Sequence, residues 1–129
     1  MLEKDQEEGD IQVSWKDQEN INAFSKHNAK LQDLEETYEI KKTEKEYLDD
    51  LAMELELADE DEPVRYRIGD AFISLSLEAA QERISKSQEE LDKEIGELKT
   101  QMDQAVEKMD ELKKVLYARF GNAINLEKD

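Results

Sequence analysis

Apolar residues in the second half of the chain recur at alternating spacings of four and three positions. Such a repeat, with a mean of about 3.5 residues, is typical of a coiled-coil helix whose apolar stripe faces a partner helix. The stripe, interrupted by one polar residue, comprises Ile84, Gln88, Leu91, Ile95, Leu98, Met102, Ala105, Met109, Leu112 and Leu116. Ser76 is suited to cap the start of this helix, and Gly121 stands where a left-handed residue often ends one. The pattern predicts a helix over residues 77–121.

The first half of the chain carries the same repeat with more polar interruptions. Its stripe comprises Phe24, His27, Leu31, Leu34, Tyr38, Lys41, Lys45, Leu48, Ala52 and Leu55. Lysine stems pack along apolar seams while their ammonium groups reach water, so the two lysines are compatible with the pattern. An acidic run at residues 59–62 and the single proline, Pro63, then interrupt the helical pattern. We predict that residues 16–62 form a first helix followed by an acidic linker.

Two short runs with strand character lie between the helical segments. Their apolar residues and the turn glycine are Val64, Tyr66, Ile68, Gly69, Phe72, Ile73 and Leu75. Gly69 and Asp70 separate the runs, and a two-residue connection containing glycine is typical of a tight β-hairpin. A lone hairpin is marginal in water and leaves both of its edges unpaired. We therefore predict that residues 63–76 form an assembly hairpin that joins strands of other chains.

The predicted fold is mainly α: a long antiparallel two-helix coiled coil with a single β-hairpin between the helices. The two helical segments are of similar length and their connector is short, so they are able to pair along their whole length. The expected register pairs Leu31 with Ala105, Leu34 with Met102, Tyr38 with Leu98 and Ala52 with Ile84, and sets Lys41 beside Ile95 and Lys45 beside Leu91.

In this arrangement the two ends of the chain come together at the outer end of the helix pair. Residues 1–15 are expected to form a flexible acidic segment, and residues 122–129 a C-terminal tail. The apolar residues near this end are Val13, Trp15, Ile21, Phe24, Leu116, Tyr117, Phe120, Ile124 and Leu126. Large exposed apolar patches usually mark binding sites, so these residues are candidates for contact with another protein. The alternative is that they cap the helices and pack locally.

Composition and charge narrow the choice of partners. Charged residues make up 41% of the chain and aromatic residues 6%, too polar a mixture for a large globular core. Low hydrophobicity and high net charge also favour disorder, but the helical periodicity argues against it. The formal net charge of −17 makes nucleic acid and an anionic membrane surface improbable partners. The absence of cysteine fits a reducing compartment, and the acidic N-terminus predicts neither a signal peptide nor a transit peptide.

Catalytic or metal chemistry finds little support in the sequence. His27 is the only histidine, and its position on the stripe favours a packed side chain over a ligand or base. The acidic run at residues 59–62 lacks the glycine and the spaced ligands of a calcium loop, so a solvated linker is favoured. We find no phosphate-binding glycine loop. The sequence therefore predicts neither an enzyme nor a bound cofactor.

Four stretches carry a resemblance to a known family. They are residues 17–24 (DQENINAF), 57–61 (LADED), 66–74 (YRIGDAFIS) and 116–127 (LYARFGNAINLE). Together with the helix–hairpin–helix layout, they resemble the β-class subunits of prefoldin over nearly the whole chain. One position departs from the family pattern: Ala79 stands where relatives often carry a capping-box glutamate three residues after the capping serine.

The resemblance implies a subunit of a hetero-hexamer with two α-class and four β-class chains, built around an intersubunit β-barrel. Such a complex holds non-native proteins, notably actin and tubulin, between the tips of its coiled coils. It passes them to the cytosolic group II chaperonin without hydrolysing ATP. A cytoplasmic location, with a possible nuclear pool, follows from the resemblance. A coiled-coil scaffold subunit in a prefoldin-like assembly for transcription or complex assembly is the alternative.

Overall fold

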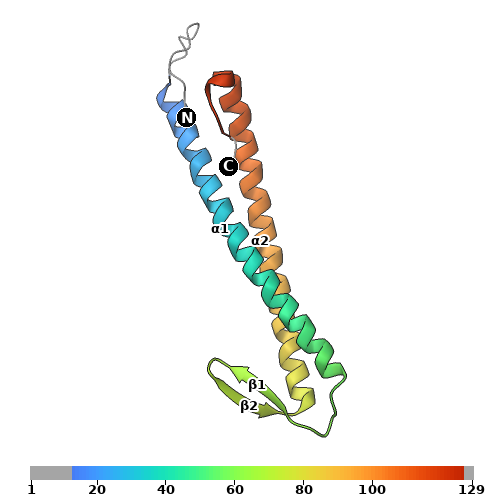
Figure 1. The fold of residues 1–129 in the computed structure, drawn as a ribbon. Helices are drawn as coiled ribbons and strands as arrows, with labels where there is room; N and C mark the ends of the chain where they lie inside the picture. Colours follow the sequence, from blue (N-terminus) through green and yellow to red (C-terminus); the bar gives the residue numbers. More distant parts are fainter. Residues whose placement is uncertain (1–12, 127–129) are drawn as a thin grey trace. The chain divides into compact units, whose positions relative to one another are not determined.

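The computed structural model describes residues 13–126 of the chain and contains two long helices with a β-hairpin between them (Figure 1). Helix α1 spans Trp15–Glu56 and helix α2 spans Leu77–Phe120. Strands β1 (Val64–Ile68) and β2 (Ala71–Leu75) pair antiparallel, and a short 3-10 helix η1 (Gly121–Ala123) follows α2. This order of elements confirms the predicted fold class.

The chain divides into two compact units. The hairpin unit is Thr37–Leu98, and the described part of the terminal unit is residues 13–36 and 99–126. Within each unit, a segment of α1 lies against a segment of α2 and runs in the opposite direction. Each unit therefore has its own small apolar core, built from both helices.

The predicted stripes form the seam between the helices. Every stripe position named above is buried or half-buried in the structure, including His27, Lys41, Lys45 and Gln88. In the terminal unit one buried apolar cluster comprises Ile21, Phe24, Leu31, Ala105, Met109, Leu116, Phe120, Ala123, Ile124 and Leu126, and Leu34 is also buried. In the hairpin unit the buried cluster comprises Leu55, Leu77, Ala80 and Ile84, with Leu51, Ala52, Val64, Tyr66 and Leu75 packed against it, and Leu91 is also buried.

Polar contacts across the hairpin unit agree with the expected register to within one residue. Lys45 Nζ lies 2.9 Å from Asp92 Oδ1, and Lys41 Nζ lies 3.4 Å from Glu94 Oε2. The expected register sets Lys45 beside Leu91 and Lys41 beside Ile95. Asp92 and Glu94 are the immediate sequence neighbours of those two residues. Each ammonium group thus leaves the seam and ends on a carboxylate at its rim, as expected for long lysine side chains.

Both ends of α2 are closed as predicted. The N–H of Ala79 donates to Ser76 Oγ over 3.1 Å, so Ser76 is the N-cap of this helix. At the other end Gly121 has φ +59°, the left-handed conformation that terminates many helices and that glycine adopts without steric cost. The missing glutamate at position 79 therefore leaves the serine half of the cap intact.

Candidate assembly and client-contact surfaces

The hairpin turns tightly at Gly69 and Asp70. Ile68 pairs with Ala71, so two residues form the loop, as predicted. Gly69 has φ +59°, and no residue other than glycine has positive φ in residues 13–126. A positive φ at the first loop position followed by a negative one at the second defines a type II′ turn, whose twist matches that of the strands.

One face of the hairpin is apolar along its whole length. Cross-strand partners lie on the same face, which brings together the pairs Val64–Leu75, Tyr66–Ile73 and Ile68–Ala71. Near the helices, Val64, Tyr66 and Leu75 pack against the core of the hairpin unit. Towards the turn, Ile68 and Ile73 are exposed. The predicted assembly residues therefore divide into three that pack within this chain and a group near the turn that is open to contact.

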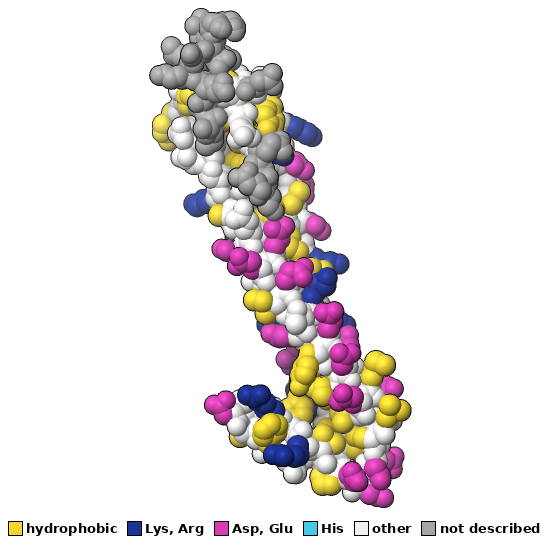
Figure 2. Space-filling view, viewed as in Figure 1, with side chains coloured by type: hydrophobic (Ala, Val, Ile, Leu, Met, Phe, Trp, Pro, Cys, Tyr) yellow, Lys and Arg dark blue, Asp and Glu magenta, His cyan; other side chains and the backbone are white. Residues whose placement is uncertain are grey.

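The opposite face of the hairpin combines arginine with an aromatic ring. Arg65 lies over the ring of Phe72 at 4.8 Å, a cation–π distance, and Phe72 remains 54% exposed. The Nε–H of Arg67 donates to the carbonyl oxygen of Gly69 over 2.8 Å and so braces the turn. Figure 2 shows Lys or Arg side chains next to hydrophobic ones on the hairpin. Both faces of the hairpin thus present apolar side chains to solvent.

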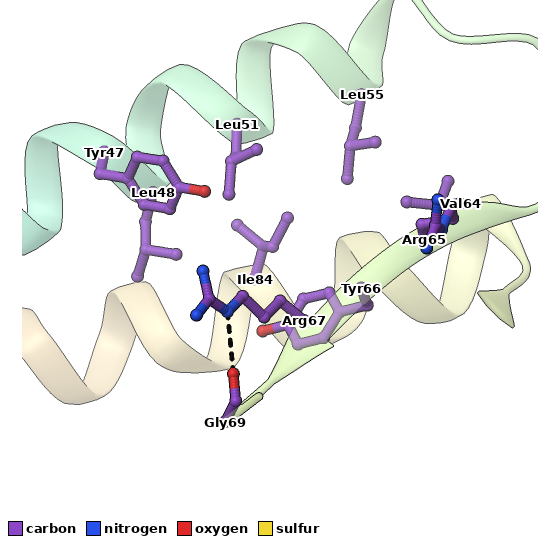
Figure 3. A pocket seen from close by; sticks show the side chains of 10 residues that line it. All are labelled: Tyr47, Leu48, Leu51, Leu55, Val64, Arg65, Tyr66, Arg67, Gly69 and Ile84. Carbon is purple, nitrogen blue, oxygen red and sulfur yellow. Dashed lines mark hydrogen bonds between the residues drawn. The ribbon is translucent and has the colours of Figure 1, made fainter. Parts of the chain in front are cut away.

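A groove of about 500 Å³ runs between β1 and the last turns of α1 (Figure 3). Tyr47, Leu48, Leu51 and Leu55 line it from the helix side, and the residues of β1 from Val64 to Arg67 line it from the strand side. In the described part of the chain the sheet has two strands, so the outer edge of β1 carries unpaired backbone groups. The groove therefore combines a free strand edge with apolar side chains, the combination that an added strand requires.

The hairpin unit also contains a polar cluster across its seam. Gln88 Nε2 donates to Asp49 Oδ1 over 2.7 Å, while Lys45 contacts both Asp92 and, at 3.8 Å, Asp49. The hydrogen bond to Asp92, followed by the charges of Asp49 and Asp92, raises the pKa of Lys45 above its ordinary value. Two of these residues, Lys45 and Gln88, occupy seam positions and are paired with Asp92 and Asp49, which favours one register over its alternatives.

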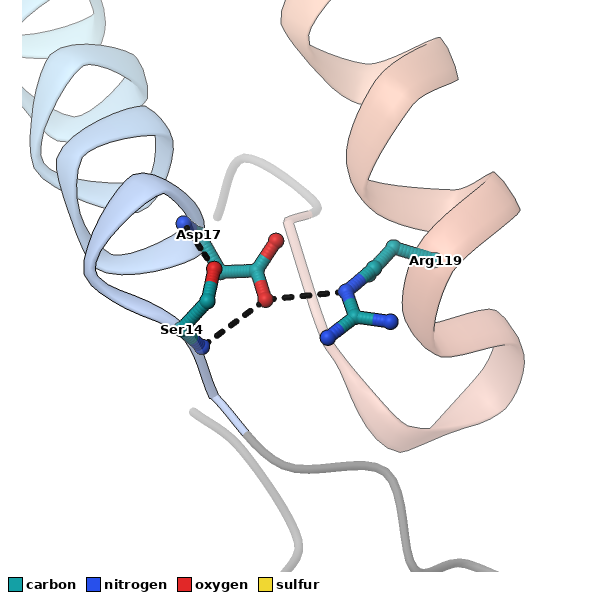
Figure 4. A network of polar contacts seen from close by, with 3 residues as sticks. All are labelled: Ser14, Asp17 and Arg119. Carbon is teal, nitrogen blue, oxygen red and sulfur yellow. Dashed lines mark hydrogen bonds and ion pairs between the residues drawn. The ribbon is translucent and has the colours of Figure 1, made fainter.

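At the outer end of the terminal unit, a capping box begins α1 (Figure 4). Ser14 N–H donates to Asp17 Oδ2 and Asp17 N–H donates to Ser14 Oγ, both over 3.0 Å. Arg119 Nε then donates to Asp17 Oδ2 over 2.9 Å. The bond from the Ser14 backbone, supported by Arg119, outweighs the opposing effect of desolvation and lowers the pKa of Asp17 below its ordinary value.

This network was not anticipated from the sequence. The Ser14–Asp17 spacing is a capping-box signal, and it places the first turn of α1 at Trp15, inside the segment expected to be flexible. The remaining part of that segment, residues 1–12, lies outside the described residues. The bond from Arg119 to Asp17 has no such local signal, because the two residues are far apart in sequence.

The nine apolar candidates for protein contact near the chain ends fall into three groups. Six are buried in the core of the terminal unit: Ile21, Phe24, Leu116, Phe120, Ile124 and Leu126. Tyr117 is half-buried, and its hydroxyl accepts a bond of 3.4 Å from the Leu126 N–H. Val13 is exposed, and Trp15 is 78% exposed. In this conformation most of these residues pack within the chain, as the alternative interpretation expected. Contact of Val13 and Trp15 with a client protein stays a prediction.

Membrane-spanning helices and metal-binding clusters are absent from the described residues. No helix there is both long and apolar enough to span a membrane. In residues 13–126, no three histidine or acidic side chains converge in a way that would hold a metal ion. The surfaces that the structure offers are therefore the exposed hairpin and the outer helix ends.

A helix–hairpin–helix chain with an exposed assembly hairpin is the architecture of a prefoldin-type subunit. The family described as "Prefoldin subunit" matches residues 18–123, and the chain belongs to this family. It is 41% identical over 117 residues to prefoldin subunit 4 of Saccharomyces cerevisiae, covering 91% of each chain. It is 37% identical over 121 residues to human prefoldin subunit 4, covering 93% of this chain and 90% of the human one.

A solved structure has the same fold. The crystal structure of the prefoldin beta subunit from Thermococcus strain KS-1 superposes with a TM-score of 0.77 at 16% sequence identity. The match covers 86% of this chain and 97% of the archaeal one. The resemblance noted in the sequence is thereby confirmed, and the chain is a subunit of the prefoldin co-chaperone that assembles with other prefoldin subunits.

Proposed function

We propose that this chain is one of four β-class subunits in a hetero-hexamer with two α-class subunits. In this proposal the hairpins of the six chains form a double β-barrel platform. The outer helix ends hold non-native actin and tubulin, and the complex delivers them to the cytosolic group II chaperonin. The proposed role needs neither a cofactor nor ATP hydrolysis by the complex, and it places the protein in the cytoplasm with a possible nuclear pool.

The observation that carries this proposal is the exposed apolar surface of the hairpin. Ile68, Phe72 and Ile73 lie exposed on a sheet of two strands, with apolar residues open on both of its faces. Water solvates such a hairpin poorly, and its unpaired edges favour the addition of strands. Sister hairpins would cover these side chains and pair with the edge of β1, while their side chains filled the groove beside Tyr47 and Leu51.

The outer helix ends are suited to holding clients by many weak contacts. Trp15 offers a large exposed ring at the first turn of α1, next to exposed Val13. One such contact is weak, but several subunits on one platform make the later contacts intramolecular and raise the overall avidity. The net charge of −17 keeps the complex soluble and favours basic segments of a client during encounter.

The assembly step is tested by a matched pair of substitutions at exposed β-branched residues. Ile68 is in the hairpin and Val106 is in α2, and both are exposed to a similar degree. We expect that Ile68→Ser, coexpressed with the sister subunits, reduces the yield of the hexamer severalfold in size-exclusion chromatography with light scattering. Val106→Ser is expected to assemble like the wild type. Equal yields for both variants would contradict assembly through this face of the hairpin.

The holding step is tested with the assembled wild-type complex. Chemically denatured actin is diluted into buffer with and without the complex, and aggregation is followed by light scattering. We expect aggregation to be suppressed at a stoichiometric concentration of complex without nucleotide. A complex of hexameric mass that leaves aggregation unchanged would favour the scaffold alternative over client holding.

A further inference from the structure

The C-terminal segment Gly121–Leu126, here called the strap, turns back onto the ends of the two helices. The left-handed Gly121 stops α2 and reverses the chain through η1. Ile124 then adopts an extended conformation, with φ −128° and ψ 142°. Ile124 and Leu126 are buried and Asn125 between them is exposed, the alternation of a strand with one face against a core. A segment expected to be a tail is thus an extended apolar strap.

Both helices contribute to the surface that the strap covers. Ile21 and Phe24 from the start of α1, together with Leu116 and Phe120 from the end of α2, form one buried cluster with Ile124 and Leu126. These four helix residues were candidates for client contact on the basis of their sequence positions. Phe24 and Leu116 also lie on the seam between the helices, and the strap packs with all four residues in one buried cluster. With the strap displaced, this apolar surface at the outer helix end would be open to another extended segment.

The attachment of the strap is of a kind that a competitor could replace. Its buried contacts are nonspecific apolar packing by Ala123, Ile124 and Leu126. One hydrogen bond near its end, from Leu126 N–H to Tyr117 Oη, is long at 3.4 Å. Ordering a short segment costs conformational entropy, which offsets part of the gain from burying three small or medium side chains.

We propose that the strap is a displaceable occupant of the client groove, and that an extended apolar segment of a non-native client takes its place. The strap itself specifies the ligand: an extended segment with aliphatic side chains at alternate positions, as in Ile124–Asn125–Leu126. This inference rests on the proposed client-holding function. It explains how one surface stays covered when no client is bound and becomes available when a client competes for it.

Hydrogen exchange on the assembled wild-type complex tests displacement directly. Amide exchange is measured by mass spectrometry with and without bound denatured actin, in peptides covering the strap and, as an internal control, the middle of α2. We expect exchange in the strap to become at least about threefold faster when client is bound, while the middle of α2 is unchanged. Unchanged or slower exchange in the strap would overturn the proposal, because a client that merely covers the tip would protect it.

A pair of variants in the assembled complex gives a second test. Ile124→Asp places a charge at a buried position of the strap, and Ala118→Asp places the same charge at an exposed position near the end of α2. Both complexes are first checked for mass by light scattering and for helix content by circular dichroism. We expect Ile124→Asp to halve client aggregation at a severalfold lower concentration than the wild type, and Ala118→Asp to match the wild type.

The outcomes separate this inference from the function on which it rests. If the wild-type complex does not suppress aggregation, the client-holding function and the strap proposal both fail. If the wild type suppresses aggregation and an intact Ile124→Asp complex does so no better, the strap proposal alone fails. Should Ile124→Asp not assemble, the hydrogen-exchange experiment on the wild type decides the matter.

Discussion

Asp17 and Arg119 join the first turn of α1 to the last turn of α2 through a 2.9 Å bond from Nε to Oδ2. Asp17 is only 5% exposed, and it also closes the capping box with Ser14. A carboxylate at a helix start is favoured by the helix dipole, and an arginine near a helix end is favoured for the same reason. The ion pair between Asp17 and Arg119 therefore places a favourable charge at the start of α1 and another at the end of α2.

This pairing predicts a specific loss of stability in acid. The folded pKa of Asp17 is lowered, so its contribution is present above the ordinary value of 3.8 and is lost as the pH falls through the lower folded value. We expect the thermal midpoint of the terminal unit to fall more steeply below pH 4 in the wild type than in Asp17→Asn. Circular dichroism melts at low protein concentration, away from the isoelectric point near 4.4, measure the difference. Parallel pH profiles for the two proteins would contradict the role of the ion pair.

Packing at the same end predicts a contrast between neighbouring residues. Leu116 is 0% exposed and Val115 is 51% exposed. We expect Leu116→Ala to destabilise the chain by about 2–5 kcal/mol through lost burial and the cavity left behind. Val115→Ala is expected to change the stability by no more than about 0.5 kcal/mol. Urea unfolding followed by circular dichroism compares the two, and similar midpoints would mean that Leu116 is not part of a packed core in solution.

The seam and the hairpin could be predicted from the sequence because they depend on local spacing. A repeat of four and three positions brings Ile84 and Leu91 to one side of a helix whatever else the chain does, and Gly69–Asp70 sets the turn by local backbone preference. Both the helix stripe and the hairpin turn could be predicted from residues that are close together in the sequence. The seam positions and the antiparallel order followed from them.

The outer helix end could not be predicted in the same way. Whether Ile124 and Leu126 are buried or exposed depends on how the chain reverses after Gly121 and on which groove it then meets. The partner of Asp17 lies 102 residues away, and no local pattern connects it to Arg119. Apolar residues at a chain end indicate a contact of some kind, but they do not distinguish intramolecular packing from binding to another protein.

The polar cluster in the hairpin unit predicts that Lys45 lowers the stability of the helix pair but helps to fix its register. Lys45 occupies a seam position, and its ammonium group leaves the seam to reach Asp92. We expect Lys45→Leu to raise the thermal midpoint, because it restores an apolar seam position while Asp92 stays solvated. The raised pKa of Lys45 predicts a contribution to wild-type stability that is present below pH 10.5 and is lost as the pH rises through the folded pKa. We expect this contribution to be absent from Lys45→Leu.

Lys93→Leu serves as the control for the Lys45 experiment. Lys93 lies on the exposed side of α2 in the same unit, so its replacement changes charge and propensity without altering the seam. Thermal melts at neutral and alkaline pH compare the two variants with the wild type. A midpoint for Lys45→Leu at or below that of Lys93→Leu would show that the lysine stem and its ion pair already pack as well as leucine.

Two glycines predict opposite effects for the same substitution. Gly69 has φ +59° in the hairpin turn, a conformation that costs a residue with a Cβ about 1–2 kcal/mol. Gly96 is inside α2, where an added Cβ would meet nothing within 4 Å and alanine is favoured over glycine by about 0.5–1 kcal/mol. We expect Gly69→Ala to lower the yield of the complex with sister subunits and Gly96→Ala to raise the thermal midpoint of the helices. If Gly69→Ala assembled as well as Gly96→Ala, the strained turn would not be required for the hairpin to join its neighbours.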